Sequence, residues 1–140
     1  MLIVYAETSS ILRWLLGTPE ASSVVRALRD AERVVASRLS IVETRRTLTR
    51  LEAEKALRGG RIARAHEELA KAINSWTVME MTDEVLARVE GRFPKEPVRT
   101  LDAIHLATAH RFHELVGPVH LLSHDARILD NWRALGLPLA

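Results

Sequence analysis

Four carboxylate side chains stand where a metal-dependent reaction would need them. Glu7 ends an apolar run, Glu43 follows a second such run, and Asp102 and Asp125 begin two later amphipathic stretches. Carboxylates that meet in one crevice repel one another, and their pKa values rise unless a cation neutralises them. Mg²⁺ or Mn²⁺ suits a site built from oxygen atoms, and such a site hydrolyses phosphodiesters by activating water. We therefore predict that all four acids are catalytic and that Glu7, Asp102 and Asp125 bind the metal.

Each acid alone also fits a structural role. Ser40 and Glu43 match a capping box, Asp102 lies in a first helical turn, where the helix dipole favours an acid, and Asp125 fits an N-cap. Glu7 is the exception, because glutamate is a poor cap and an acid at the tip of a buried strand is costly unless it is paired. Convergence of the four side chains would decide between the two explanations.

Polar residues beside these acids are predicted to support them. The hydroxyls of Thr8, Ser9 and Ser123 would orient the carboxylates. Arg46 and Arg50 share a helical face with Glu43 and are candidates for binding RNA phosphates.

Arg99 and the late histidines are the other basic residues considered for RNA or metal binding. Arg99 precedes Asp102 and is a third candidate for RNA binding. For the helix that carries Arg46 and Arg50, a solvated face with i,i+4 pairs to Glu52 and Glu54 is an equally good explanation. The late histidines show no metal-ligand spacing, and we expect His105 to be a buried, hydrogen-bonded residue that supports the core or the site.

The elements that must position these residues alternate along the chain. Apolar, β-branched runs predict five strands, and 3.6-residue periodicity predicts seven helices. The strands are expected at 2–6, 33–37, 76–81, 119–123 and 137–140, and the helices at 9–16, 19–31, 41–57, 61–73, 83–91, 101–114 and 126–135. Alternation of this kind predicts a parallel sheet covered by helices on both faces, with ligands bound beyond the carboxyl ends of the strands.

Composition narrows the class of protein. The 140 residues form one expected domain, 1–140, and the absence of cysteine excludes thiolate chemistry. Neither a signal peptide nor a membrane span is apparent, so we expect a soluble, cytoplasmic protein without membrane contact. Without a glycine-rich phosphate loop, nucleoside triphosphate hydrolysis is disfavoured. Only three of the 20 cationic residues are lysines, and the arginine excess permits a nucleic-acid partner without demonstrating one, because a GC-rich genome would produce it too.

Four segments resemble the PIN-domain family, specifically its VapC-type toxins. They are "LIVYAETSSILRWLL", "VVASRLSIVETRRTLTRL", "VRTLDAIHLATAH" and "LLSHDARILDNWRALGLPL". The resemblance implies an α/β fold, a three-layer α/β/α sandwich with a central parallel sheet of about five strands. It also implies an endoribonuclease that depends on Mg²⁺ or Mn²⁺, products with 5′-phosphate and 3′-hydroxyl ends, a homodimer, and a VapB-like antitoxin that neutralises the enzyme.

The residues carried over by position are the same four acids. The resemblance makes Asp102 a principal metal ligand and Ser123 the hydroxyl residue that precedes the last acid. It also places an antitoxin along the early helices and a helical hairpin. Apolar residues that are equally well explained as core would contribute to that groove: Ile11, Trp14, Leu15, Leu48 and Leu51.

One position departs from the family. Its first acid is normally aspartate, and Glu7 is longer by one methylene, about 1.5 Å. Because catalytic geometry is sensitive to shifts of about 1 Å, Glu7 suggests the alternative of a weakened or silent PIN domain that binds RNA or an antitoxin. A phosphatase or receiver-like domain is a third possibility, disfavoured because no lysine follows at a strand end.

Overall fold

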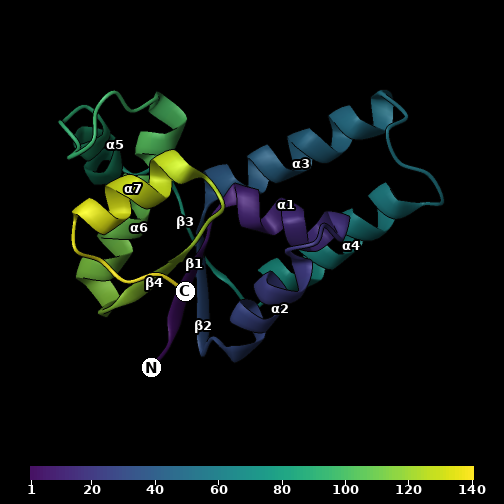
Figure 1. Ribbon diagram of the computed structural model, residues 1–140, viewed down its shortest axis with the longest axis horizontal. Helices are drawn as coiled ribbons and strands as arrows, with labels where there is room; N and C mark the ends of the chain where they lie inside the picture. The colour runs from purple at the N-terminus through teal and green to yellow at the C-terminus, as the bar shows by residue number, and fades with distance from the viewer.

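The centre of the computed structural model, which describes residues 1–140, is a parallel sheet of four strands (Figure 1). The strands are β1 (Ile3–Ala6), β2 (Arg33–Ser37), β3 (Thr77–Met79) and β4 (Val119–Leu122), and their order in the sheet is β3-β2-β1-β4. Val4 of β1 lies opposite Val34 on one side and His120 on the other. The carboxyl ends of β1 and β4 therefore lie side by side, which places Glu7 next to the segment that follows Leu122.

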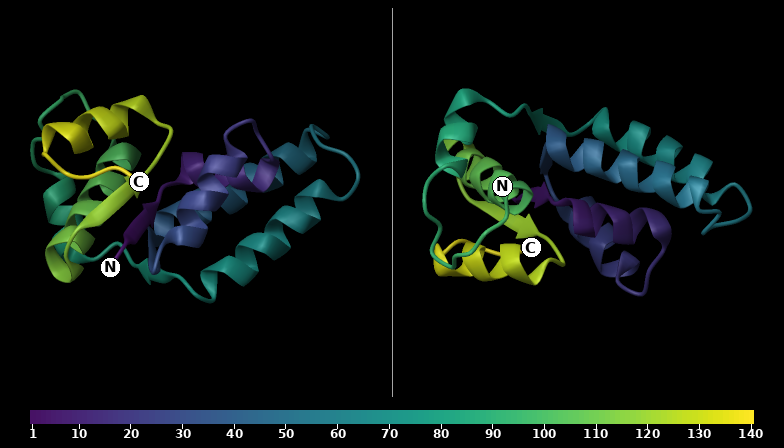
Figure 2. Two further views of the ribbon diagram at one scale, coloured as in Figure 1. Left: turned by 60° about the horizontal axis from the view of Figure 1, so that its bottom comes forward. Right: turned by 90° about the horizontal axis from the view of Figure 1, so that it is seen from above.

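Seven helices flank the sheet in two groups. They are α1 (Thr8–Leu16), α2 (Ala21–Asp30), α3 (Arg38–Ala53), α4 (Arg61–Ile73), α5 (Asp83–Val89), α6 (Thr100–Val116) and α7 (Ala126–Ala134). Figure 2 shows α5, α6 and α7 on one side of the sheet and α1 to α4 on the other. No helix combines the length and apolar character required to cross a membrane.

The side chains of the central strands supply both cores. Tyr5 and Leu121 pack with α6 and α7 in the larger cluster, whereas Val4 and Leu122 pack against α2 on the opposite face. Every residue of β1 is buried, as expected for a strand covered on both faces. The predicted three-layer α/β/α fold is confirmed.

The structure corrects the expected number of strands. The predicted fifth strand, 137–140, is reduced to a single parallel bridge between Leu139 and Leu121. Pro138 has no amide proton to donate, so it contributes only its carbonyl, which accepts from the Leu121 N–H. One paired residue does not make a strand.

The helical hairpin is present, but its first helix is shifted. The predicted helix at 41–57 begins earlier, at Arg38, and ends earlier, at Ala53. Gly60, in the left-handed region with φ of 71°, precedes α4. Leu48, Ile62 and Ala65 form a small core between α3 and α4, which together extend as an arm to the right in Figure 1.

Candidate active site

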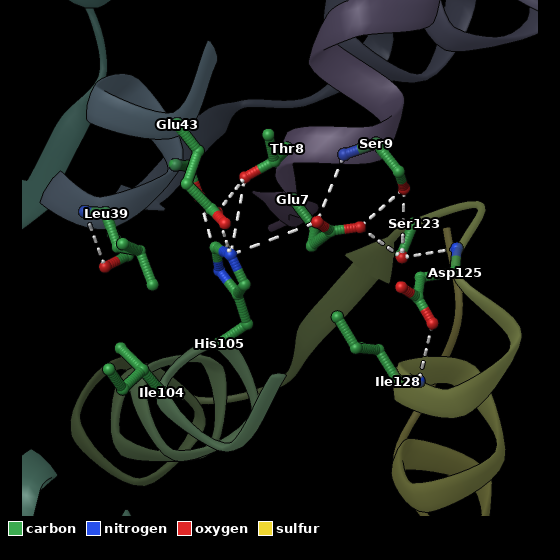
Figure 3. Close-up of polar contacts among 12 residues, drawn as sticks. Glu7, Thr8, Ser9, Leu39, Glu43, Ile104, His105, Ser123, Asp125 and Ile128 are labelled. Carbon is green, nitrogen blue, oxygen red and sulfur yellow. Dashed lines mark hydrogen bonds and ion pairs between the residues drawn. The ribbon is translucent and has the colours of Figure 1, made fainter. Parts of the chain in front are cut away.

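Glu7 is buried at the junction of β1 and α1, with only 4% of its surface exposed. Its Oε1 accepts hydrogen bonds from the Ser9 and Ser123 hydroxyls, each at 2.5 Å, and its Oε2 accepts from the Ser9 N–H at 3.1 Å (Figure 3). These donors supply the pairing that a carboxylate needs when it leaves water. Glu7 is thus also the N-cap of α1, a role for which glutamate is a poor choice by sequence.

The hydroxyls around Glu7 also lock α1 to the segment after β4. Ser9 Oγ accepts from the His124 N–H at 2.8 Å, and Ser123 Oγ accepts from the Asp125 N–H at 3.0 Å. The side chains of Ser10 and His124 meet at 2.8 Å. Ser9 and Ser123 therefore lie where they were predicted, in contact with a carboxylate of the candidate site.

Asp125 follows directly as the N-cap of α7. Its Oδ1 accepts from the N–H groups of Arg127 and Ile128 at 2.9 and 3.4 Å. The structural explanation of this acid is therefore correct, but it accounts for only one oxygen, since Oδ2 makes no hydrogen bond to the protein.

Asp102 lies in the first turn of α6 and makes no hydrogen bond or ion pair through its side chain. Burial raises the pKa of this carboxyl, and the negative charges of Asp125 and Glu7 raise it further. Arg127 acts in the opposite direction but does not cancel the effect. Three of the predicted acids, from three segments of the chain, therefore act on one another electrostatically.

Glu43 lies in the second turn of α3 and faces a different set of partners. Its Oε1 accepts from Thr8 Oγ1 at 2.7 Å and lies 2.6 Å from His105 Nε2. Burial alone would raise the pKa of Glu43, but the hydrogen bonds from His105 and Thr8 hold it below its ordinary value. Glu43 therefore remains ionised at neutral pH.

The structural explanation offered for Glu43 is wrong. Ser40 and Glu43 do not form a capping box, because α3 starts earlier and Ser37 caps it by accepting from the Leu39 N–H at 3.0 Å. Thr8 contacts Glu43, one of the carboxylates that it was expected to orient. The prediction that His105 is buried and hydrogen-bonded is confirmed, since it is 2% exposed and contacts Glu43.

Sequence reasoning missed Tyr5, whose hydroxyl lies 3.0 Å from His105 Nδ1. The sequence did hold a signal for it, because Tyr5 carries the only side-chain hydroxyl in an otherwise aliphatic strand and a buried tyrosine hydroxyl requires a hydrogen-bond partner.

The three candidate RNA-binding arginines are exposed and touch none of the acids. Arg50 lies 3.9 Å from Glu54 in the i,i+4 pair that was the alternative explanation. Arg46 and Arg99 make no ion pair and remain available for a phosphate.

The same residues can be tested against the divalent cation that the four acids predict. As the side chains stand, no group of three acidic or histidine residues is arranged to hold an ion. Asp102 nevertheless has both oxygens free, Asp125 has one, and mutual repulsion raises the pKa of Asp102. Mg²⁺ is usually held by one or two protein carboxylates and several waters, so the chemistry of Asp102 and Asp125 fits such an ion.

Comparisons with known proteins show the family of this chain. The family model described as "PIN domain" matches residues 4–131. Ribonuclease VapC46 of Mycobacterium tuberculosis is 34% identical to this chain over 137 residues, which are 98% of this chain and 95% of the relative. The crystal structure of VapC20 from the same organism, described as a Sarcin-Ricin loop cleaving toxin, matches with a TM-score of 0.64. Its sequence identity is 17%, and the match covers 99% of this chain and 98% of VapC20, so this likeness supports the fold. The chain therefore belongs to the PIN-domain family and is a homologue of its VapC-type ribonuclease toxins.

Proposed function

We propose that this chain, as one functional domain spanning 1–140, is a metal-dependent endoribonuclease that cleaves RNA phosphodiester bonds. The observation that carries the proposal is the approach of Asp102, Asp125 and Glu7 at the carboxyl ends of β1 and β4, where burial and then the charges of Asp125 and Glu7 raise the pKa of Asp102. A cation would relieve that repulsion. Membership of the PIN-domain family supports the same chemistry and leaves no support for a phosphatase or receiver-like domain.

The proposed Mg²⁺ or Mn²⁺ would be held by Asp102, Asp125 and Glu7. Asp102 is the principal ligand because neither of its oxygens is engaged, whereas both oxygens of Glu7 already accept hydrogen bonds from Ser9 or Ser123. When bound, such an ion lowers the pKa of water and stabilises charge on the phosphorus oxygens. Ser9 and Ser123 hold Glu7 in place.

Glu43 has a separate role in the proposed reaction. Its carboxylate is kept ionised, and its Oε2 makes no hydrogen bond to the protein. We assign Glu43 to orient the attacking water and accept its proton, which requires an ionised side chain.

Ion binding can be tested without activity. In ion-free buffer, Asp102→Asn removes a repelled charge and should raise the unfolding temperature, by about 1 °C because the site is partly exposed. Adding Mg²⁺ or Mn²⁺ should stabilise the wild-type protein and leave the variant unchanged. Asp83→Asn, an acid in the first turn of α5, is the matched control and should respond to the ion as the wild type does. Equal stabilisation of Asp102→Asn would place the ion elsewhere.

Removing the metal should stop the reaction. Purified protein treated with EDTA should leave a structured RNA intact, and Mg²⁺ or Mn²⁺ should restore cleavage with 5′-phosphate and 3′-hydroxyl products. Gel analysis of end-labelled RNA measures both. Cleavage that persists in EDTA would contradict the proposed chemistry. RNA binding without cleavage in either ion would support the alternative of a silent PIN domain.

A second part of the proposal concerns a VapB-like antitoxin. Ile11 and Leu48 are fully buried and belong to the core, but Trp14 and Leu15 reach the surface. Trp14 lines two neighbouring pockets of about 260 and 210 Å³, one of which also contains Arg61 and Arg64 of α4. This apolar surface with a basic rim suits an amphipathic peptide carrying acidic residues. Trp14→Ala should weaken capture of a co-expressed antitoxin and leave cleavage unchanged.

The remaining parts of the proposal follow the family and depend on solution measurements. A homodimer is expected, and analytical ultracentrifugation would detect it. If Arg46 and Arg99 bind phosphates, replacing either with alanine should weaken RNA binding and reduce its salt dependence by about one ion each.

A further inference from the structure

Tyr5, His105 and Glu43 form a buried chain of side chains that links three elements of the fold. Tyr5 lies in β1 and is 0% exposed, and His105 lies in α6 and is 2% exposed. Tyr5 Oη is 3.0 Å from His105 Nδ1, and His105 Nε2 is 2.6 Å from Glu43 Oε1 on α3. The proposed reaction assigns a role only to Glu43, the last member of the chain.

The position of the proton on His105 follows from its neighbours. Nε2 faces a carboxylate oxygen that has no proton of its own, so Nε2 must be the donor, because two acceptors at 2.6 Å would repel. Thr8 already donates to the same oxygen at 2.7 Å. The other ring nitrogen, Nδ1, faces the Tyr5 hydroxyl at 3.0 Å and the Ser40 hydroxyl at 3.4 Å.

Tyr5 is placed to act as a donor to Nδ1. The hydroxyl is fully buried, and Nδ1 at 3.0 Å is its only hydrogen-bond partner. Ser40 Oγ lies farther from the same nitrogen, at 3.4 Å, so Tyr5 makes the shorter contact. Because Nε2 already donates to Glu43, Nδ1 can accept the hydroxyl proton of Tyr5.

We propose that Tyr5 is a positioning residue that holds His105 as the neutral Nε2–H tautomer, and that His105 in turn holds the Glu43 carboxylate. Both donors to Glu43, from His105 and Thr8, meet Oε1. Oε2 is thereby left free for the reacting water. The hydroxyl of Tyr5 in β1 thus sets the orientation of the Glu43 carboxylate on α3. Outer hydrogen-bond partners orient the residues of metal sites in the same way.

Nitrogen-15 NMR of the histidine side chains tests the tautomer directly. The chain has six histidines, and His105→Gln identifies the His105 signals by their loss. In the wild-type protein we expect Nε2 protonated and Nδ1 unprotonated. In Tyr5→Phe the Nδ1 signal should shift, because its donor is gone. A doubly protonated ring, or a proton on Nδ1 alone, in the wild-type protein would overturn the proposal.

Cleavage kinetics test the positioning role, and this arm rests on the proposed ribonuclease function. Tyr5→Phe should lower kcat about 10-fold to 100-fold with KM for RNA unchanged. His105→Gln should retain kcat within about tenfold, because glutamine can both donate to Glu43 and accept from Tyr5. Thr108→Val is the matched control, since this hydroxyl is buried in α6 and bonds only to the Ile104 carbonyl at 2.7 Å.

The outcomes separate the two ideas. If Tyr5→Phe folds, as measured by circular dichroism, and keeps the wild-type kcat, Tyr5 has no positioning role. If Tyr5→Phe does not fold, a kcat for His105→Gln reduced as strongly as for His105→Phe would overturn the hydrogen-bonding role of the chain. If the wild-type protein cleaves no RNA in either ion, the proposed function fails, while the NMR result still decides the tautomer.

Discussion

Asp102→Asn should reduce RNA cleavage by about a thousandfold, the largest single effect expected in this protein. Asparagine keeps the size of the side chain but removes the negative charge at Asp102, where burial and the charges of Asp125 and Glu7 raise the pKa. Loss of metal-supported charge stabilisation at the phosphorus is worth several kcal/mol, and about 4 kcal/mol corresponds to three orders of magnitude in rate. Single-turnover cleavage of a labelled RNA at saturating Mg²⁺ or Mn²⁺ measures it.

The control for Asp102→Asn is the same aspartate-to-asparagine change at a position outside the site. Asp83→Asn changes an acid in the first turn of a helix by the same atoms, and Asp83 lies in α5, outside the cluster. It should cleave at the wild-type rate. If Asp102→Asn cleaves within tenfold of Asp83→Asn, the role assigned to Asp102 is wrong.

Glu7→Gln should lower cleavage by about a hundredfold and also destabilise the fold. The glutamine amide would place a donor or a weaker acceptor against the hydroxyls of Ser9 and Ser123, which now both donate to Oε1. A buried hydrogen-bonding group that loses its partner costs about 1 to 3 kcal/mol. Urea denaturation gives the free energy of unfolding, and the cleavage assay gives the rate. Glu32→Gln, at an exposed acid near the N-terminus, should leave both unchanged.

The aspartate variant decides what the extra methylene of Glu7 does. Because Glu7 reaches hydroxyls on both α1 and the segment after β4, we expect Glu7→Asp to lose the contact with Ser123 and to cleave more slowly than the wild type. Faster cleavage would show the reverse, that glutamate is a handicap which aspartate relieves. Comparison of the Glu7→Asp and wild-type cleavage rates therefore tests the alternative of a weakened PIN domain.

Much of the fold could be predicted because its signals are local. β-branched runs identified all four strands, and 3.6-residue periodicity identified all seven helices, although α3 is shifted towards the N-terminus. Two predictions were wrong because local signals could not decide them: the residue that caps α3 and the strand at 137–140. Ser37 and Ser40 lie three positions apart and are both serines, a residue type that caps helices, and only the end of β2 makes Ser37 the cap. The predicted fifth strand is absent because apolar composition alone does not show how many residues can pair, and Pro138 has no N–H to donate to a neighbouring strand.

The sequence by itself determined which side chains could do chemistry. Glu7, Asp102 and Asp125 each lie where a strand or loop gives way to a helix, and Glu43 follows a strand within the next helix. The rule that such junctions face one edge of a parallel sheet predicts that these acids gather. That inference needs only residue types, order and spacing. The oxygen-only character of the site follows in the same way, since the chain has no cysteine.

Only the tertiary structure decided how these side chains are shared among partners. Glu7 binds two hydroxyls, Asp125 caps a helix, Glu43 meets His105, and Asp102 alone keeps both oxygens free. Tyr5 and His105 are 100 residues apart, and their 3.0 Å contact depends on how α6 packs against the face of β1. Hydrogen bonds depend on distances of tenths of an ångström and on angle, whereas sequence patterns are averages over a helical turn or a strand.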